Sequence, residues 1–150
     1  IVRLIEFMDV GNRNGWRVDQ VVPSRQLLEQ VTKRWPLRRI DKNYPGEVAR
    51  RYSYVDGQGE IGFISSVTEP FCGDCSRARL SADGVLYTCL FASQGTDLRE
   101  ALRDKADEEE LTDILSRIWL QRADRYSELR SPELAEHHRH RKVDLYRIVG

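Results

Sequence analysis

The chain has 150 residues and a mass of 17.5 kDa, which is long enough for a domain with a hydrophobic core. Its 24 basic and 24 acidic residues cancel, so no overall electrostatic field favours binding to a nucleic acid or to a membrane surface. Apolar residues make up 40%, and no apolar run approaches the roughly 20 residues of a membrane span, so the composition predicts a soluble globular protein.

The first seven residues, IVRLIEF, predict a buried strand because most of them are apolar and several are β-branched. Arg3 interrupts this run, and its charge needs an anionic partner unless the side chain lies near a sheet edge and reaches water. A loop follows over 8–15, where Gly-Asn and Asn-Gly are strong turn formers. Because the chain opens on this strand, without methionine or a signal peptide, we expect a fragment of a longer protein from a reducing compartment.

The next segments predict a helix and a hairpin. The helix begins at Pro23-Ser24, with Ser24 as N-cap, and ends near Trp35-Pro36. Its buried stripe is formed by Leu27, Leu28 and Val31. Residues 46–54 and 59–65 lie on either side of Asp56-Gly57, which indicates two antiparallel strands joined by a turn.

A second hairpin is predicted for 76–80 and 85–90, on either side of Asp83-Gly84. Two helices follow, a short one through Leu102 that Thr96 or Asp97 caps and a longer one over about 108–123. The apolar residues of the longer helix have helical spacing and are expected to be buried: Leu111, Ile114, Leu115, Ile118 and Trp119.

The end of the chain predicts an exposed loop and a last strand. His137, His138 and His140 lie in a polar stretch rich in arginine, and residues 143–149 alternate between apolar and polar. The order of strand, hairpins and helices places the chain in the α+β class.

All three cysteines, Cys72, Cys75 and Cys89, fall in one stretch that includes the second hairpin. A Cys-x-x-Cys loop can direct two thiolates at one metal, and a hairpin can bring a third beside them. A structural zinc site needs a fourth ligand, which a histidine could provide. An iron–sulfur cluster with three cysteines would leave one iron open to substrate. The spacing therefore leaves three interpretations open: an iron–sulfur cluster, a zinc site and plain buried thiols.

Arg77 and Arg79 follow directly after the Cys-x-x-Cys loop. In a strand, residues two apart project from the same face, so both guanidinium groups would point the same way. Two such groups suit a triphosphate or carboxylates. The alternative is that they form surface ion pairs with nearby acids, namely Asp74, Asp83 or Glu69.

These residues resemble a known family. The motif PFCGDCSRARL at 70–80, followed by ADG at 82–84 and CLF at 89–91, is similar to the C-terminal cluster motif of the GTP 3',8-cyclase family. The similarity extends to RLIEFMDVGNRNG at 3–15 and GEIGFIS at 59–65, with the same order and spacing. Members of this family are radical S-adenosylmethionine enzymes that open molybdenum cofactor biosynthesis. They convert GTP to (8S)-3',8-cyclo-7,8-dihydroguanosine 5'-triphosphate, which passes to cyclic pyranopterin monophosphate synthase.

The resemblance implies a role for each matching residue. Cys72, Cys75 and Cys89 would hold a second [4Fe–4S] cluster whose open iron takes the guanine end of GTP. The GTP site would be lined by Arg3, Arg77, Ala78 and Arg79, and Met8 would contact S-adenosylmethionine. In fold, residues 1–20 would be the end of an incomplete radical SAM (βα) barrel, and 21–150 the C-terminal cluster and GTP-binding domain built of antiparallel hairpins and helices.

Two departures from the family are visible. The family's first cluster uses a Cys-x-x-x-Cys-x-x-Cys motif, which these 150 residues do not contain, so the isolated chain is expected to be inactive. Members usually end in two glycines, whereas this chain ends in Val149-Gly150. From the family we also expect a homodimer in the bacterial cytoplasm, with no nucleic-acid or membrane partner. The alternative function is a small zinc-binding interaction module.

Overall fold

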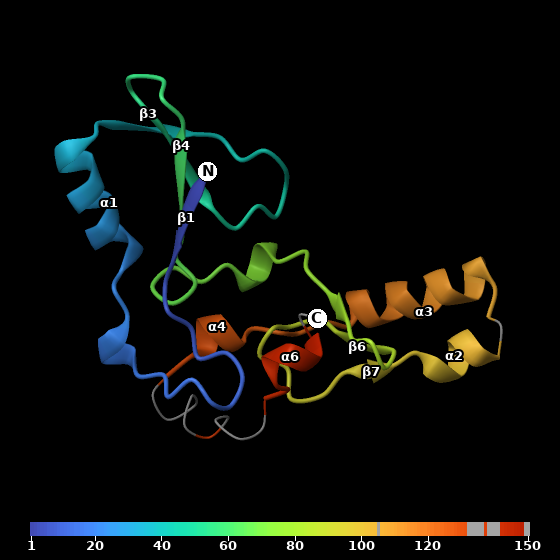
Figure 1. Ribbon diagram of the computed structural model, residues 1–150. Helices are drawn as coiled ribbons and strands as arrows, with labels where there is room; N and C mark the ends of the chain where they lie inside the picture. Colours follow the sequence, from blue (N-terminus) through green and yellow to red (C-terminus); the bar gives the residue numbers. More distant parts are fainter. Residues whose placement is uncertain (105, 132–136, 138–141, 149–150) are drawn as a thin grey trace. The chain divides into compact units, whose positions relative to one another are not determined.

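The computed structural model describes residues 1–104, 106–131, 137 and 142–148 (Figure 1). They form two compact units, each with its own sheet. Unit 1 consists of the described residues within Ile1–Asp9, Trp16–Ser76 and Ser127–Pro132. Unit 2 consists of the described residues within Val10–Gly15, Arg77–Tyr126 and Glu133–Gly150. The α+β class expected from the sequence is confirmed, because helices accompany one mixed and one antiparallel sheet.

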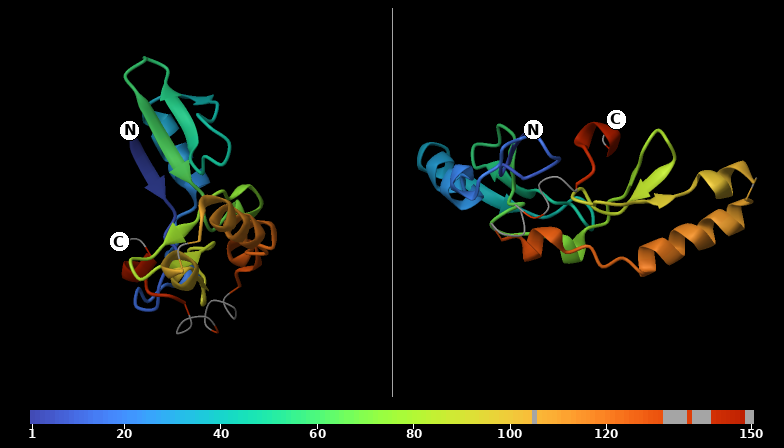
Figure 2. Two further views of the ribbon diagram at one scale, coloured as in Figure 1. Left: turned by 90° about the vertical axis from the view of Figure 1, so that its right-hand side faces the viewer. Right: turned by 90° about the horizontal axis from the view of Figure 1, so that it is seen from below.

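Unit 1 is built on a four-stranded sheet with the order β1-β4-β3-β2 (Figures 1 and 2). Strand β1 (Val2–Ile5) is an edge strand and pairs in parallel with β4 (Glu60–Ile64). Strands β4, β3 (Arg50–Tyr54) and β2 (Leu37–Ile40) are antiparallel neighbours. The first predicted hairpin is therefore confirmed as β3 and β4, and Gly57 has the positive φ of 77° that Gly tolerates at such a turn.

Helix α1 (Ser24–Arg34) packs against β4 and covers one face of this sheet (Figure 2). It begins and ends where predicted, and its apolar stripe is half-buried, but the prediction that Ser24 is the N-cap is wrong. Pro23 occupies that position, and the backbone N–H of Ser24 donates to Glu6 Oε1 at 2.8 Å. A carboxylate from another element thus replaces the local cap, because it satisfies the same orphan donor at the start of the helix.

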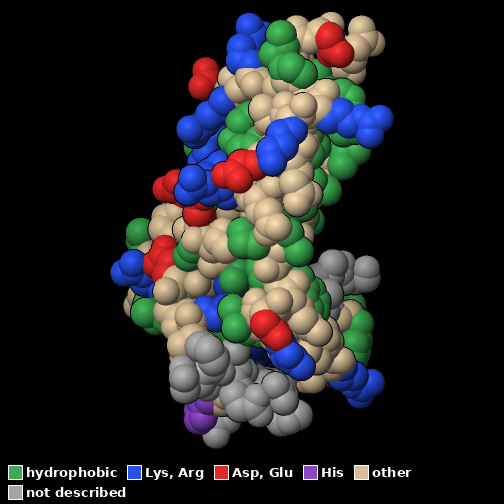
Figure 3. All heavy atoms as spheres, turned by 90° about the vertical axis from the view of Figure 1, so that its left-hand side faces the viewer, with side chains coloured by type: hydrophobic (Ala, Val, Ile, Leu, Met, Phe, Trp, Pro, Cys, Tyr) green, Lys and Arg blue, Asp and Glu red, His purple; other side chains and the backbone are tan. Residues whose placement is uncertain are grey.

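Figure 3 shows the face of unit 1 on which α1 lies. Basic and acidic side chains stand next to one another there, and Arg25 and Glu29 of α1 form an i,i+4 ion pair at 3.2 Å. The described residues on this face gather no patch of a single charge sign. This agrees with the zero net charge of the sequence.

Unit 2 contains an antiparallel sheet with the order β5-β6-β7. Its strands are β5 (Arg79–Leu80), β6 (Val85–Tyr87) and β7 (Thr96–Asp97). The second predicted hairpin is confirmed as β5 and β6, although both strands are shorter than expected. Thr96 and Asp97 form β7 rather than only capping a helix, and Asp97 Oδ1 still accepts from the N–H of Arg99 at 2.8 Å, where α2 (Arg99–Arg103) begins.

Helix α3 (Glu108–Leu120) confirms the longer predicted helix and begins at a capping box. Asp107 accepts from the N–H of Glu110 at 2.9 Å, and Glu110 accepts from the N–H of Asp107 at 3.2 Å. The half-buried stripe is Leu111, Ile114 and Ile118. The expected burial of Leu115 and Trp119 is wrong, since they are 42% and 40% exposed. They lie at the rim of the i, i+3, i+7 face rather than on it, and Arg122 covers Trp119 at 4.5 Å.

The predicted last strand over 143–149 is also wrong as far as the structure describes it. Residues Leu145–Ile148 form the short helix α6, preceded by α4 (Tyr126–Leu129) earlier in the chain. The backbone N–H of Arg147 donates to the backbone carbonyl of Asp144 at 3.0 Å, which is the bond of a helical turn rather than of a strand ladder. His138, His140, Val149 and Gly150 lie outside the described residues. No helix among the described residues is long and apolar enough to cross a membrane.

Candidate metal centre and nucleotide site

The Cys-x-x-Cys loop of unit 1 is held in a compact turn. Residues Cys72–Asp74 form a 3-10 turn, closed by a hydrogen bond from Cys75 N–H to the Cys72 carbonyl at 3.2 Å. Glu128 of α4 accepts from the N–H of Gly73 at 3.2 Å. Both cysteines are half-buried. The local backbone thus keeps two thiols close together at one short turn, which is the arrangement that a Cys-x-x-Cys metal site requires.

Cys89 lies in unit 2, just after β6, and its sulfur accepts a hydrogen bond from the N–H of Phe91 at 3.4 Å. Phe91 stacks on Tyr126 at a centroid distance of 4.6 Å, and the Lys142 ammonium lies 5.4 Å from the Phe91 ring and 4.7 Å from the Tyr126 ring. A backbone donor aimed at sulfur stabilises the thiolate form, which is the form that binds iron. The aromatic pair holds this donor in place.

The structure brings Cys72 and Cys75 together but does not place Cys89 relative to them, because the three are divided between the two units. Accordingly, the described residues of each unit contain no group of three or more His, Cys, Asp or Glu side chains that could hold a metal ion. The donor chemistry nevertheless fits an iron–sulfur cluster, since three half-buried thiols and an N–H directed at sulfur are typical of such sites. His137, the one histidine described, is exposed.

Arg77 and Arg79 lie at the start of unit 2, with Arg79 in β5. Both are half-buried, while Ser76, Ala78 and Leu80 are exposed. This alternation is what two side chains on the same strand face produce.

The acids named as alternative partners of these arginines form ion pairs with other basic residues. Glu69 pairs with Arg50, Asp74 with Lys42 at 3.8 Å, and Asp83 with Arg147 at 3.6 Å. Each of these three acids thus has a basic neighbour of its own.

The sequence allowed Arg3 either an anionic partner or a position near a sheet edge, and the structure shows both. It lies on the edge strand β1 with a side chain 43% exposed, and its Nη2 is 3.7 Å from the carboxylate of Glu47. Glu47 is itself buried, with 4% of its surface exposed. Arg3 thus reaches water and also has an anionic partner, and it keeps donors for a ligand.

Met8 follows β1, half-buried between two acidic anchors. On one side, the Glu6 carboxylate accepts from the N–H groups of Ser24, Val67 and Thr68, each at 2.8 Å, and from the Thr68 hydroxyl at 2.6 Å. Burial alone raises the pKa of Glu6, but these hydrogen bonds outweigh it and hold the pKa below its ordinary value of 4.5.

On the other side of Met8, Asp9 accepts from Arg130 Nε at 2.9 Å, and both side chains are almost fully buried. Arg130 also donates to the carbonyl of Ser66 at 3.1 Å. Two buried carboxylates therefore fix the backbone around Met8 to the segment that follows β4, which leads to the cysteine loop.

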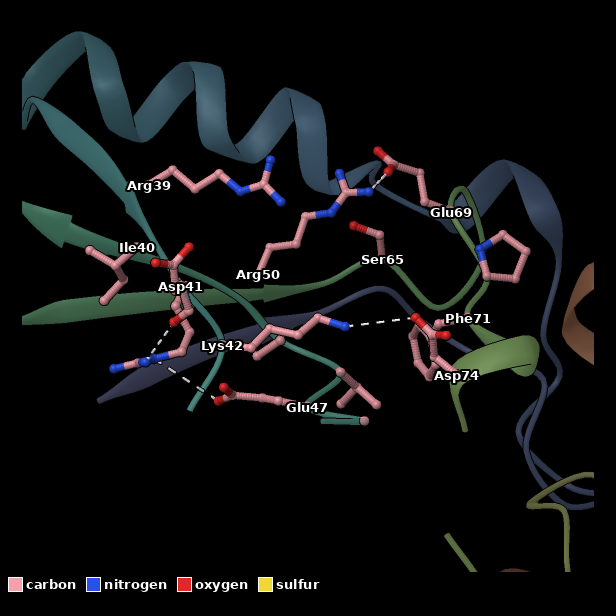
Figure 4. A pocket seen from close by; sticks show the side chains of 15 residues that line it. Arg39, Ile40, Asp41, Lys42, Glu47, Arg50, Ser65, Glu69, Phe71 and Asp74 are labelled. Atoms are coloured by element: carbon pink, nitrogen blue, oxygen red, sulfur yellow. Dashed lines mark hydrogen bonds and ion pairs between the residues drawn. The ribbon is translucent and has the colours of Figure 1, made fainter. Parts of the chain in front are cut away.

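A charged pocket of about 640 Å³ opens in unit 1 between β2, β3 and the segment before the cysteine loop (Figure 4). Its charged side chains are mixed in sign: Arg39, Lys42, Arg50 and Arg51 with Asp41, Glu47, Glu69 and Asp74. Sequence reasoning missed this pocket. The only signal for it was a high density of charge in LRRIDK at 37–42, immediately before a turn-forming stretch.

Comparison with known proteins shows to which family the chain belongs. The profile of the family described as Molybdenum Cofactor Synthesis C matches residues 1–128. The chain belongs to this family. The match includes β1, the four-stranded sheet, all three cysteines and both of the paired arginines.

Curated relatives extend the comparison to the end of the chain. GTP 3',8-cyclase from Xanthomonas campestris pv. campestris (strain B100) is 54% identical over 150 residues, which is 100% of this chain and 43% of the relative. The enzyme of the same name from Acidothermus cellulolyticus is 44% identical over 172 residues, covering 100% of this chain and 48% of the relative. That from Synechococcus sp. (strain WH7803) is 54% identical over 129 residues, or 86% of this chain and 36% of the relative. The chain therefore spans less than half the length of these relatives.

Proposed function

We propose that this chain of the Molybdenum Cofactor Synthesis C family is the cluster-bearing and GTP-binding C-terminal part of a GTP 3',8-cyclase. The observation that carries the proposal is the alignment of the chain over its whole length with a relative of that name, at 54% identity. The half-buried cysteines and the N–H bond to Cys89 sulfur support it independently. In this reading residues 1–20 end a radical SAM barrel, and the edge strand β1 is its last strand.

Cys72, Cys75 and Cys89 would hold a [4Fe–4S] cluster. Such a cluster, with three cysteine ligands, leaves one iron able to accept the guanine end of GTP. The protein's own contribution is to fix the sulfurs: the turn at Cys72–Asp74 sets two of them, and the N–H of Phe91 stabilises the third as thiolate.

The residues proposed to bind GTP are Arg3, Arg77, Ala78 and Arg79. Arg77 and Arg79 are both half-buried, with exposed Ala78 between them, and Arg3 is partly exposed on β1. Their planar guanidinium groups suit the triphosphate or ribose of GTP. Met8, fixed by its two flanking carboxylates, would contact S-adenosylmethionine. Further expectations from the family are a homodimer, delivery of product to cyclic pyranopterin monophosphate synthase, and a cytoplasmic location.

Metal content tests the proposal directly. After anaerobic reconstitution the chain should contain about four iron and four sulfide per polypeptide, because a [4Fe–4S] cluster has that composition. Cys89→Ser should lose most of the iron, since only two cysteine ligands remain. The measurement is iron and acid-labile sulfide analysis with the visible absorption spectrum. A parallel reconstitution with zinc is the control, and stoichiometric zinc that iron and sulfide cannot replace would favour the zinc-binding interaction module instead.

The chain should also be inactive on its own. Its 150 residues contain no Cys-x-x-x-Cys-x-x-Cys motif, so nothing in them would hold the cluster that initiates radical chemistry. Incubation of the reconstituted chain with GTP, S-adenosylmethionine and dithionite should yield no cyclised nucleotide and no 5'-deoxyadenosine by liquid chromatography. A full-length relative run in parallel provides the positive control, and turnover by the isolated chain would refute this assignment.

A further inference from the structure

Three facing residues, Arg3, Gly62 and Arg51, form a row across the sheet of unit 1. The register pairs Arg3 of β1 with Gly62 of β4, and Gly62 with Arg51 of β3. Facing residues project from the same side of a sheet, so the two arginine side chains flank the bare backbone of the glycine. A Cβ at Gly62 would lie 3.3 Å from Arg3 Cγ and 3.4 Å from the Cβ of Ala49. Because Gly62 has no side chain, the space above it stays open, and both arginines can approach the same acidic residue there.

That partner is Glu47, from the loop between β2 and β3. Its Oε1 lies 3.7 Å from Arg3 Nη2 and 4.0 Å from Arg51 Nε, while its Oε2 accepts from the N–H of Asn43 at 2.6 Å. The side chain is only 3% exposed, and Oε1 makes no hydrogen bond with any described residue. A buried carboxylate of this kind is costly unless positive charge compensates it, and the two guanidinium groups provide that charge.

The two arginines are held very differently. Arg51 is 12% exposed and donates to Glu60 at 2.7 Å, to Asn43 Oδ1 at 2.7 Å and to the carbonyl of Asp41 at 2.8 Å. Within the described part of the chain, the Glu47 carboxylate is the one ion-pair partner of Arg3. Arg51 is thus held by several partners, and Glu47, a lining residue of the pocket in Figure 4, lies between Arg51 and the 43% exposed side chain of Arg3.

We propose that Glu47 is a positioning residue for nucleotide binding: its buried carboxylate, anchored on Arg51, holds the Arg3 guanidinium oriented for an anionic ligand. This inference rests on the proposed function, in which that ligand is GTP. Arg3 Nη2 lies 3.7 Å from Glu47, and the other guanidinium donors stay available because the side chain is 43% exposed. Preorganisation of this kind favours binding because the arginine loses less rotamer freedom when the ligand arrives.

The first test needs no ligand. A double-mutant cycle with Arg3→Ala and Glu47→Gln, measured by urea unfolding, should show that the effects of the two substitutions are not additive. Additive effects would overturn the contact between Arg3 and Glu47. Should Glu47→Gln fail to fold, Glu47→Asp replaces it, because this variant keeps the buried charge but withdraws the carboxylate from Arg3. Glu29→Gln on α1, in the same unit, is the control and should be additive with Arg3→Ala.

The second test measures GTP affinity of the cluster-loaded chain by isothermal titration calorimetry. We expect Glu47→Gln or Glu47→Asp to weaken binding about tenfold in the parent chain and to have no effect in the Arg3→Ala background, since the modest coupling of contacting groups is lost with Arg3. Unchanged or tighter binding by the Glu47 variants would overturn the positioning role. If Arg3→Ala itself leaves the affinity unchanged, the proposed contact of Arg3 with GTP is wrong, and the functional role of Glu47 is wrong with it. The two failures are therefore distinguishable.

Discussion

Replacing Glu6 with glutamine should lower the free energy of unfolding of the chain by about 4 kcal/mol, because several buried donors then lose a charged acceptor at once. The carboxylate is 2% exposed and accepts from the N–H groups of Ser24, Val67 and Thr68 and from the Thr68 hydroxyl. It joins the end of β1, the start of α1 and the segment after β4. Glutamine has one acceptor oxygen, and its amide group would face N–H donors. Urea unfolding at pH 7 measures the effect.

The same carboxylate gives a prediction for pH. The pKa of Glu6 is below 4.5 in the folded chain, so the folded state favours the ionised form more than the unfolded state does. Its contribution is fully present above the ordinary pKa and is lost as pH falls through 4.5 toward the folded pKa.

The difference in unfolding free energy between the parent chain and Glu6→Gln should therefore be smaller at pH 4 than at pH 7. Glu29→Gln, which changes an exposed glutamate on α1, should instead cost less than about 0.5 kcal/mol at either pH. A Glu6→Gln variant as stable as the parent chain at pH 7 would contradict the bridging role.

Local signals predicted the elements whose ends are set by nearby residues. Both hairpins follow from Asp-Gly pairs between short strands, and α3 begins at the capping box of Asp107 and Glu110. These features depend on backbone conformation and on contacts within a few residues. For that reason sequence spacing alone is enough to find them.

Elements that depend on distant partners were missed. Strand β2, LRRI, contains two arginines and lacks a clear alternation, and it exists because it pairs with β3, Leu37 opposite Tyr54. The N-cap of α1 was assigned to Ser24, whereas the acceptor is Glu6, 18 residues earlier. Alternation over 143–149 suggested a strand, but the hydrogen bond from Arg147 to Asp144 makes a helix. In the first two cases tertiary contacts outweigh local propensity, whereas in the third a local helical turn forms despite the apolar–polar alternation.

Some residues of the candidate site were also visible in the sequence, and others were not. The cysteines and Arg77 and Arg79 are candidates because of their spacing in the sequence, and Arg3 is a candidate because of the resemblance to a known family. Glu47 was not a candidate, since an acid in a loop carries no sign that it will be buried. Its role depends on Gly62 leaving space between two arginines from strands far apart in the chain.

Removing both Arg77 and Arg79 should weaken GTP binding by the cluster-loaded chain about 100-fold or more. Each charge-assisted contact to an anion contributes about 1.5–3 kcal/mol, and about 1.4 kcal/mol corresponds to a tenfold change in affinity. Both side chains are half-buried and lie two residues apart, so we expect them to act on the same anion, and neither is fully screened by solvent. Isothermal titration calorimetry of the Arg77→Ala/Arg79→Ala variant, after iron and sulfide analysis shows equal cluster loading, gives the comparison.

Control variants distinguish specific contacts of Arg77 and Arg79 with GTP from the effect of losing positive charge in general. Arg25→Ala removes an exposed arginine of α1, 84% of whose side chain is accessible, and should leave GTP affinity within about twofold because an exposed surface charge contributes little. Arg77→Lys/Arg79→Lys keeps both charges but loses the planar forks, and should recover only part of the affinity if bidentate contacts matter. Full recovery with lysine would mean that charge alone attracts the nucleotide. Unchanged affinity in the double alanine variant would move the GTP site away from β5 altogether, and the cysteines would then be the only part of the motif tied to the proposed reaction.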